Sequence, residues 1–213
     1  MKDFFDTGFR YNNSVSFSNA TDATTYYVSL SQIKDNGIIP TNSDSYTKYT
    51  FSANASQKVK AVTISTALNY AYQKNSFVTT GQGGGSMYNA IMQTPRDISI
   101  AELKDLNDPF NTPGYYYTPY GITNPYWILN NYENKYEDER FYGKLQLDYD
   151  FLKYFKATYR FGLDTHTGHR NVGIPNRESL FKDTYNADAS TIAGAIGSVT
   201  QQTTRQREIN QTS

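Results

Sequence analysis

The feature that most constrains this chain is a regular alternation of apolar and polar residues along several of its segments. Between residues 140 and 151, Phe141, Leu145 and Leu147 share one parity, while Lys144 and Asp148 share the other. A helix would scatter these two sets around its surface, whereas a β-strand sorts them onto opposite faces. The alternation therefore predicts strands with one apolar face and one polar face. It is clearest in three segments, residues 61–72, 140–151 and 155–164.

Weaker alternation elsewhere extends the pattern to about seven strands, most of them longer than the usual length of about 5–6 residues. The weaker strands are predicted at residues 14–18, 26–31, 49–56 and 203–212. The connections differ in length: short turns are expected at residues 19–22, 58–60 and 152–154, and long loops at about 76–137 and 167–202. Short turns are therefore expected at one end of the sheet and long loops at the other.

The composition excludes several classes of protein. With 20 Lys and Arg residues against 20 Asp and Glu residues, the formal net charge is +0, which removes the basic face that a nucleic-acid-binding protein needs. The chain has no Cys, so it has neither a disulfide framework nor a thiolate metal site. It lacks an apolar run long enough for a transmembrane helix, and its first residues do not resemble a signal peptide. Its 20 Tyr and 12 Phe residues favour pleated surfaces.

Long two-faced strands, with short turns at one rim and long loops at the other, are typical of an outer-membrane β-barrel. We therefore expect an all-β fold, an antiparallel transmembrane barrel segment with lipid on the apolar face and lumen water on the polar face. Because such barrels close completely with an even number of strands, an odd count indicates an internal piece of a larger barrel. A soluble or surface-exposed β-rich module that binds glycans or proteins is the alternative. Aromatic residues suited to interfacial girdles are Tyr70, Tyr72, Phe141, Tyr154 and Phe155.

Six short phrases, in their order and spacing, resemble the SusC/RagA family of TonB-linked (TonB-dependent) outer-membrane transporters. They occupy residues 4–8, 13–18, 25–30, 35–40, 124–127 (Asn-Pro-Tyr-Trp) and 160–164 (Arg-Phe-Gly-Leu-Asp). The resemblance implies a barrel of about 22 strands behind a plug domain. It also implies import of oligosaccharides or peptides, a SusD-like surface lipoprotein as a lid, and energy from the TonB complex. Residues 1–213 would then be a partial barrel domain without plug and signal peptide, and TonB would act through missing N-terminal parts.

Two sets of side chains are candidates for function in such a barrel. The first is the polar face of the strands, because charges there cost little in a wet lumen. The candidates that would face the lumen are Lys144, Asp148, Lys156, Arg160 and Asp164. The second is an aromatic cluster in the first long loop, whose rings would contact a sugar, a peptide or the lipoprotein lid, or would pack the loop on itself. Its members are Tyr115, Tyr116, Tyr117, Tyr120, Tyr126 and Trp127.

The remaining motifs carry little chemistry. Residues 81–85 (Gly-Gln-Gly-Gly-Gly) lack the Lys-Ser/Thr pair of a phosphate-binding loop and predict loop flexibility. His166 and His169 lie three residues apart, a spacing that suits metal ligation from a helix better than from a loop, so we predict no metal site. No arrangement typical of catalysis stands out, and we expect neither an enzyme nor a cofactor. Helical turns are predicted within the first long loop, at residues 86–93 and 100–106.

Overall fold

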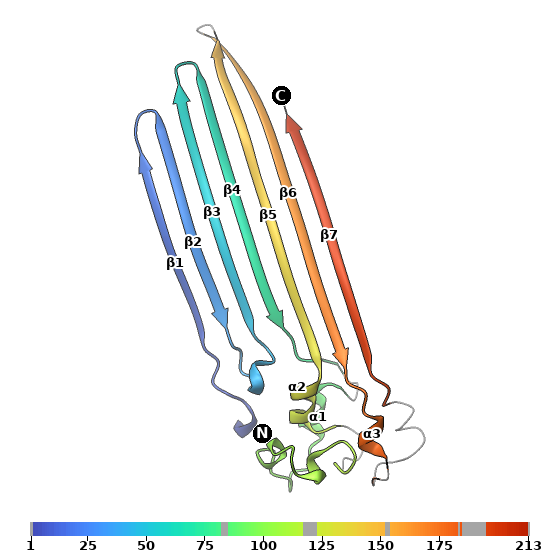
Figure 1. Cartoon of the computed structure of the whole chain (residues 1–213). Helices are drawn as coiled ribbons and strands as arrows, with labels where there is room; N and C mark the ends of the chain where they lie inside the picture. The colour runs from blue at the N-terminus through green and yellow to red at the C-terminus, as the bar shows by residue number, and fades with distance from the viewer. Residues whose placement is uncertain are drawn as a thin grey trace.

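The computed structural model describes residues 2–81, 85–116, 123–151, 154–182, 184 and 195–212. It contains one antiparallel sheet of seven strands, paired in sequence order, with β1 and β7 as the open edges of the described part. Figure 1 shows the strands side by side, with the helices gathered at one end. The strands are β1 (Arg10–Ala20), β2 (Thr24–Asp35), β3 (Tyr46–Val59), β4 (Val62–Ser76), β5 (Glu133–Phe151), β6 (Phe155–Ile174) and β7 (Ser198–Thr212). The predicted all-β antiparallel fold is confirmed.

The strands run further than the alternation indicates at the end that carries the long loops. β5 begins at Glu133 and β6 ends at Ile174, although the sequence pattern assigns residues up to 137 and from 167 onward to loops. β7 begins at Ser198 rather than at residue 203. Polar residues occupy both parities in these outer parts, so the contrast between faces that marks a half-buried strand is lost. The ladder pairing of β5, β6 and β7 nevertheless continues through them, and the two loops shrink to residues 77–132 and 175–197.

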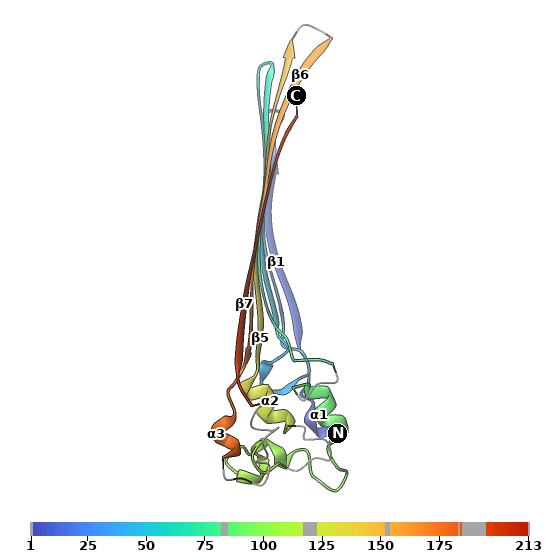
Figure 2. The same cartoon turned by 90° about the vertical axis from the view of Figure 1, so that its right-hand side faces the viewer.

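The strand register separates the two parities across the whole sheet. One row across the seven strands contains Phe17, Val28, Ala53, Leu68, Gly143, Leu163 and Ile209. The adjacent row, on the opposite face, contains Ser16, Ser29, Ser52, Asn69, Tyr142, Asp164 and Glu208. We call these the apolar face and the polar face. Figure 2 shows the sheet edge-on as a single layer, and none of the described helices covers either of its broad faces.

A small layer of helices lies at the end of the sheet where the two long loops leave it, which we call the loop end; the opposite end is the turn end. The helices are α1 (Met87–Gln93), α2 (Pro125–Asn131) and α3 (Glu178–Phe181), with the 3-10 turns η1 (Lys2–Phe4), η2 (Pro40–Asn42), η3 (Glu102–Lys104) and η4 (Pro109–Asn111). The predictions at residues 86–93 and 100–106 correspond to α1 and η3, whereas α2 and α3 were not anticipated. No helix in the described part of the chain has the length and apolar character needed to cross a membrane.

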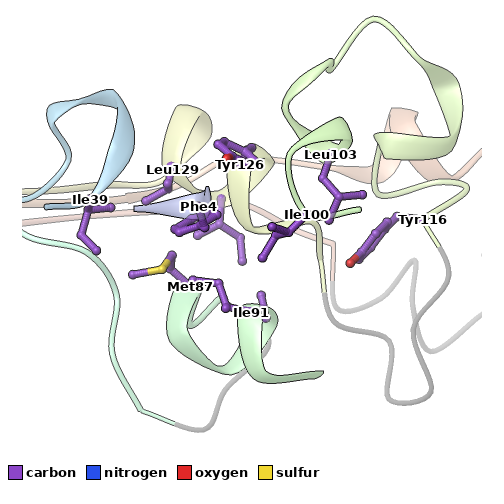
Figure 3. Packing of buried hydrophobic residues seen from close by; sticks show 11 residues of the cluster. Phe4, Ile39, Met87, Ile91, Ile100, Leu103, Tyr116, Tyr126 and Leu129 are labelled. Atoms are coloured by element: carbon purple, nitrogen blue, oxygen red, sulfur yellow. The ribbon is translucent and has the colours of Figure 1, made fainter. Parts of the chain in front are cut away.

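The buried apolar core lies in this helical layer and not in the sheet. Among the described residues, every buried apolar side chain comes from the layer or from the segments leading into it, and none comes from a strand. The main cluster, part of which Figure 3 labels, consists of Phe4, Ile39, Met87, Ala90, Ile91, Ile100, Leu103, Tyr116, Tyr126, Ile128 and Leu129. We call these eleven residues the loop cluster. The described chain therefore consists of a sheet with two uncovered faces and this compact cluster at its loop end.

The turn between β2 and β3 depends on Gly37. Its φ is +60°, and a Cβ there would collide with the carboxylate of Asp44. That carboxylate accepts hydrogen bonds from the backbone N–H groups of Ile38 and Ile39, both at 3.1 Å, while its partial burial raises the pKa of Asp44 above the ordinary value. We expect Gly37→Ala to lower the free energy of unfolding by about 1–3 kcal/mol, measured by urea titration.

A matched control for this substitution is Gly162→Ala in β6. A Cβ at Gly162 would meet only ordinary van der Waals contacts, the nearest at 3.7 Å. The control should change the free energy of unfolding little. Equal losses in the two variants would contradict the role assigned to the turn at Gly37.

Candidate functional site

The polar face of β5 and β6 brings the predicted charged residues together. Lys144 and Asp148 lie on β5, and Lys156, Arg160 and Asp164 lie on β6, all with one parity of the β5–β6 register. The prediction that these residues share one face is therefore confirmed. Their exposure to the lumen of a barrel stays a prediction.

Asp148 is the centre of one polar network on this face. It accepts hydrogen bonds from Thr158 Oγ1 at 2.7 Å and from Gln146 Nε2 at 2.9 Å, and Lys156 Nζ lies 3.7 Å away. Arg160 joins the network by donating from Nε to Gln146 Oε1 at 3.1 Å. Asp148 is only 6% exposed, and these partners supply the hydrogen bonds that a buried carboxylate needs.

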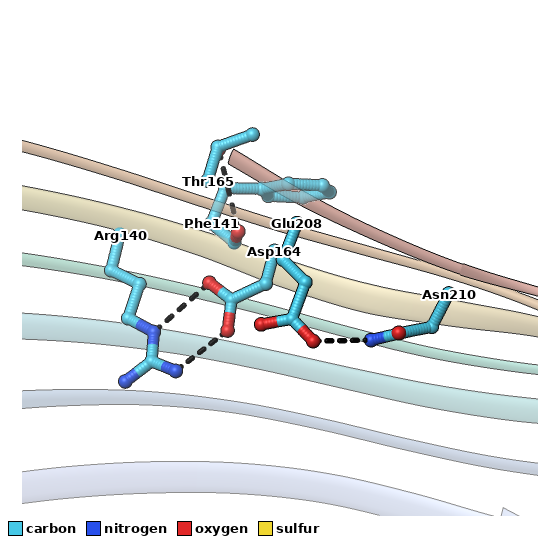
Figure 4. A network of polar contacts seen from close by, with 6 residues as sticks. All are labelled: Arg140, Phe141, Asp164, Thr165, Glu208 and Asn210. Atoms are coloured by element: carbon cyan, nitrogen blue, oxygen red, sulfur yellow. Dashed lines mark hydrogen bonds and ion pairs between the residues drawn. The ribbon is translucent and has the colours of Figure 1, made fainter. Parts of the chain in front are cut away.

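A second network lies nearer the loop end and is drawn in Figure 4. Arg140 donates from Nε and Nη2 to the two carboxylate oxygens of Asp164, at 3.1 and 2.6 Å, in a bidentate pair. Directly across from Asp164 on β7, Glu208 accepts a hydrogen bond from Asn210 at 3.0 Å. The side chains of the ion pair are 53% and 29% exposed, so solvent screens the pair and it adds little to stability. Its effect is to fix the direction of two charged side chains.

The two histidines lie on opposite faces of β6, as expected for strand residues three positions apart. His166 is on the polar face, where it pairs with Asp138, and Asp138 also accepts a hydrogen bond from Tyr136 Oη at 3.0 Å. His169 is on the other face, with Nδ1 3.1 Å from Thr203 Oγ1. The two rings are therefore not placed to ligate one metal ion. Among the described residues, no group of three potential His, Asp or Glu ligands comes together.

Two hollows open on the polar face near the loop end. The smaller one, of about 220 Å³, is lined by Asp138, Arg140, Asp164, His166, Gln206 and Glu208, and four of these six already pair with one another. The larger one, of about 540 Å³, lies between the start of the first long loop and the ends of β5, β6 and β7. Sequence reasoning missed both hollows, because each needs the register of three strands.

The aromatic residues of the first long loop mostly pack inside the helical layer. Tyr116, Tyr126 and Trp127 are 6%, 3% and 7% exposed, and the ring of Tyr126 lies 4.8 Å from that of Phe4. Burial raises the pKa of the Tyr116 and Tyr126 hydroxyls. The faces of these three rings are not open to a ligand in this structure. Tyr115 is more accessible, and its contact role stays a prediction.

Two members of the predicted aromatic set, Tyr117 and Tyr120, lie outside the described residues. Residues 82–84 of the glycine-rich segment also lie outside them, so its predicted flexibility is untested.

Asn124 organises the loop cluster, although the sequence analysis assigned it no role of its own. It is fully buried; its Nδ2 donates to the carbonyls of Leu103 and Asn111, both at 2.9 Å, and its Oδ1 accepts from the Tyr126 N–H. Asn124 is thus the N-cap of α2, and Pro125 occupies the first helical turn. An Asn-Pro pair is a recognised helix-start signal, so the sequence did contain the evidence for α2.

The apolar face changes character sharply along β5. From the loop end, its first four side chains are charged: Glu133, Lys135, Glu137 and Glu139. From Phe141 to Phe151 no side chain on this face is charged, and aromatic residues mark both edges. At the edge nearer the loop end, Phe141 pairs with Tyr70. At the edge nearer the turn end, the Phe151 ring stacks on Phe155 at 5.7 Å. We call this stretch and its neighbours on the other strands the apolar band.

The predicted girdle residues lie near the edges of the apolar band. Tyr70, Phe141 and Phe155 lie directly at the two edges, and Tyr72 lies two residues beyond Tyr70 toward the loop end. Tyr154 lies in the β5–β6 turn and is 85% exposed.

No protein-family model matches this sequence, and no curated protein matches it significantly. Among solved structures, a chain of the RagAB peptide importer in its closed-closed state is similar over 98% of the present chain, with a TM-score of 0.67 and 16% identity. The similarity shows the fold: the seven-stranded antiparallel sheet matches part of a β-barrel and is not closed in this chain. Chains of the RagAB importer in its open-open state and of the RagAB peptide transporter are also similar, over 82% and 86% of this chain, each with a TM-score of 0.62 and 18% identity. The present chain spans 22%, 19% and 20% of those three chains, about a fifth of their length.

Proposed function

We propose that this chain is a wall segment of an outer-membrane β-barrel transporter of the SusC/RagA type, which imports nutrients such as oligosaccharides or peptides. The observation that carries the proposal is the pairing of a continuous apolar band with a charged, hydrogen-bonded opposite face on one sheet. The fold similarity to chains of the RagAB peptide importer supports the same conclusion. The apolar face would contact lipid, and the polar face would line the lumen.

The height of the apolar band supports a membrane-spanning role. On β5 the band runs from Phe141 to Phe151, a length that fits the requirement of about 9–11 residues for a tilted strand to cross the hydrocarbon. The charged residues of β5 on the same face begin at Glu139, on the loop-end side of the aromatic edge at Phe141. Between the apolar band and the loop end, Lys74 and Glu137 form an ion pair of 2.6 Å, as is common for side chains in contact with water. The loop end would therefore project from the outer surface.

The loop cluster suggests where partners would act. It forms a packed layer at the loop end, on the side where a SusD-like lipoprotein lid would sit. Energy from the TonB complex would enter through a plug domain N-terminal to the barrel. These two partners and the imported substrate belong to the proposal.

The absence of Cys makes a direct test practical. Single cysteines at residues 64–69 of β4 would carry a nitroxide spin label, with the protein reconstituted in lipid vesicles. We expect collisions with dissolved oxygen, which concentrates in lipid, to peak at Ile64, Thr66 and Leu68. Collisions with a water-soluble nickel complex should peak at the three intervening positions.

A period-two contrast between the two reagents would support a membrane-spanning strand. High nickel accessibility at all six positions would contradict the proposal and favour the soluble or surface-exposed binding module. Uniformly low accessibility to both reagents would indicate a dry protein core and would also contradict it.

A further inference from the structure

We infer that the larger hollow on the polar face is a binding site for the carboxyl terminus of an oligopeptide. The inference rests on the proposed function and names a substrate class for it. The hollow has a volume of about 540 Å³, within the range of about 300–1,000 Å³ that is common for ligand pockets. Three features of its lining define the chemistry: an unpaired cation, an unsatisfied acceptor and an aromatic wall.

The cation is Arg170, the one charged residue among the described residues that line the hollow. Its direct cross-strand neighbours are Tyr136 on β5 and Gln202 on β7, neither of which is acidic. The side chain of Arg170 makes no ion pair or hydrogen bond with another described residue. The other two arginines of β5 and β6 on this face differ, because Arg140 is bound by Asp164 and Arg160 by Gln146. The Arg170 guanidinium is therefore available for a bidentate carboxylate.

The acceptor is Oδ1 of Asn134, which is buried and has no hydrogen-bond partner. Asn134 also lines the hollow, and its backbone carbonyl accepts a hydrogen bond from the Phe77 N–H at 2.8 Å. That bond holds the start of the first long loop beside the strands. A buried acceptor without a donor is costly, so a ligand N–H or O–H at this point would be favourable.

The wall consists of Phe77 and Val78 from the loop and the ring of Tyr136 from β5. Gly168 keeps space beside that ring, because a Cβ there would lie 2.9 Å from Tyr136 Oη. Asn134 on β5 is a diagonal cross-strand neighbour of Arg170 on β6, and the backbones of such neighbours lie about 7–8 Å apart. The last residue of a peptide presents a carboxylate, an amide N–H and a side chain within that distance. It would satisfy the cation, the acceptor and the apolar wall together.

The test uses the complete transporter in detergent and isothermal titration calorimetry. The probes are N-acetyl-Ala-Phe with a free carboxylate, the same peptide with an amidated C-terminus, and galacturonic acid. We expect the free acid to bind about 10- to 100-fold more tightly than the amide, because the hydrogen bonds to Arg170 are charge-assisted. Arg170→Gln should abolish this preference, and Arg170→Lys should retain part of it.

Arg205→Gln is the matched control, since it removes one positive charge from β7 on the opposite face. It should leave the preference for the free acid unchanged. Equal binding of acid and amide by the unaltered protein would overturn the inference, and so would tighter binding of galacturonic acid than of the peptide.

Heat-dependent gel mobility separates the two proposals, because folded barrels migrate differently before and after boiling. A protein without this behaviour would overturn the proposed function and this inference with it. A folded barrel that binds acid and amide alike would overturn the inference alone.

Discussion

Asn124→Ala is expected to loosen the packing of α2 on the rest of the loop cluster while the strands of the sheet remain paired. The substitution removes the helix cap, at a cost of about 0.5–2 kcal/mol. It also leaves the buried carbonyl of Leu103 and the partly buried carbonyl of Asn111 without their donor, at about 1–3 kcal/mol each when no water replaces it. Because these costs do not simply add, we expect a local loss of about 3–5 kcal/mol. Amides of α2 should then exchange hydrogen about 100-fold faster or more, measured by mass spectrometry.

Asn131→Ala provides the control within the same helix. Asn131 is exposed, and its Nδ2 donates to the Trp127 carbonyl at 2.8 Å on the helix surface. Water can replace that donor, so exchange in α2 should accelerate by less than about tenfold. Comparable acceleration in the two variants, or acceleration in β5 as large as in α2, would contradict the role assigned to Asn124.

The sequence predicted those parts of the strands in which apolar and polar residues alternate. Phe141 to Phe151 could be assigned to two faces because one face is apolar and the other polar, and the register confirms the assignment. The extension of β5 back to Glu133 could not be predicted in this way. Both of its faces are polar there, and the strand persists because β4 and β6 supply ladder partners on both sides.

The candidate site required information that alternation does not contain. The Arg140–Asp164 pair follows only from the β5–β6 register, which places Asp164 opposite Tyr142 and diagonal to Arg140. The burial of Tyr126 was also hidden, because a tyrosine in a polar loop suits a ligand contact and a packed core equally well. Its location became clear only once α2 was seen to pack on Phe4.

Ile64→Arg is expected to prevent stable insertion of the protein in a membrane. Ile64 lies in the middle of the apolar band, in the row that includes Leu147 and Tyr159, and is 43% exposed in the isolated sheet. If lipid covers this face, an arginine at that depth costs about 2–4 kcal/mol. That is a large part of the total stability of about 5–15 kcal/mol of a typical protein. The expected result is a loss of the heat-modifiable band in outer-membrane fractions and a lower urea midpoint in vesicles.

Ser65→Arg tests the same strand, the same depth and the same charge on the other face. Ser65 lies on the polar face, where its hydroxyl is 3.1 Å from that of Ser56 and its partner on β5 is the uncharged Gln146. An arginine there can reach lumen water, so insertion should be retained and the urea midpoint should change little. Because strand propensity, depth and charge are the same in the two variants, a difference between their urea midpoints reports whether lipid or water covers each face. A soluble module has water on both faces, and the two substitutions would then have similar, small effects.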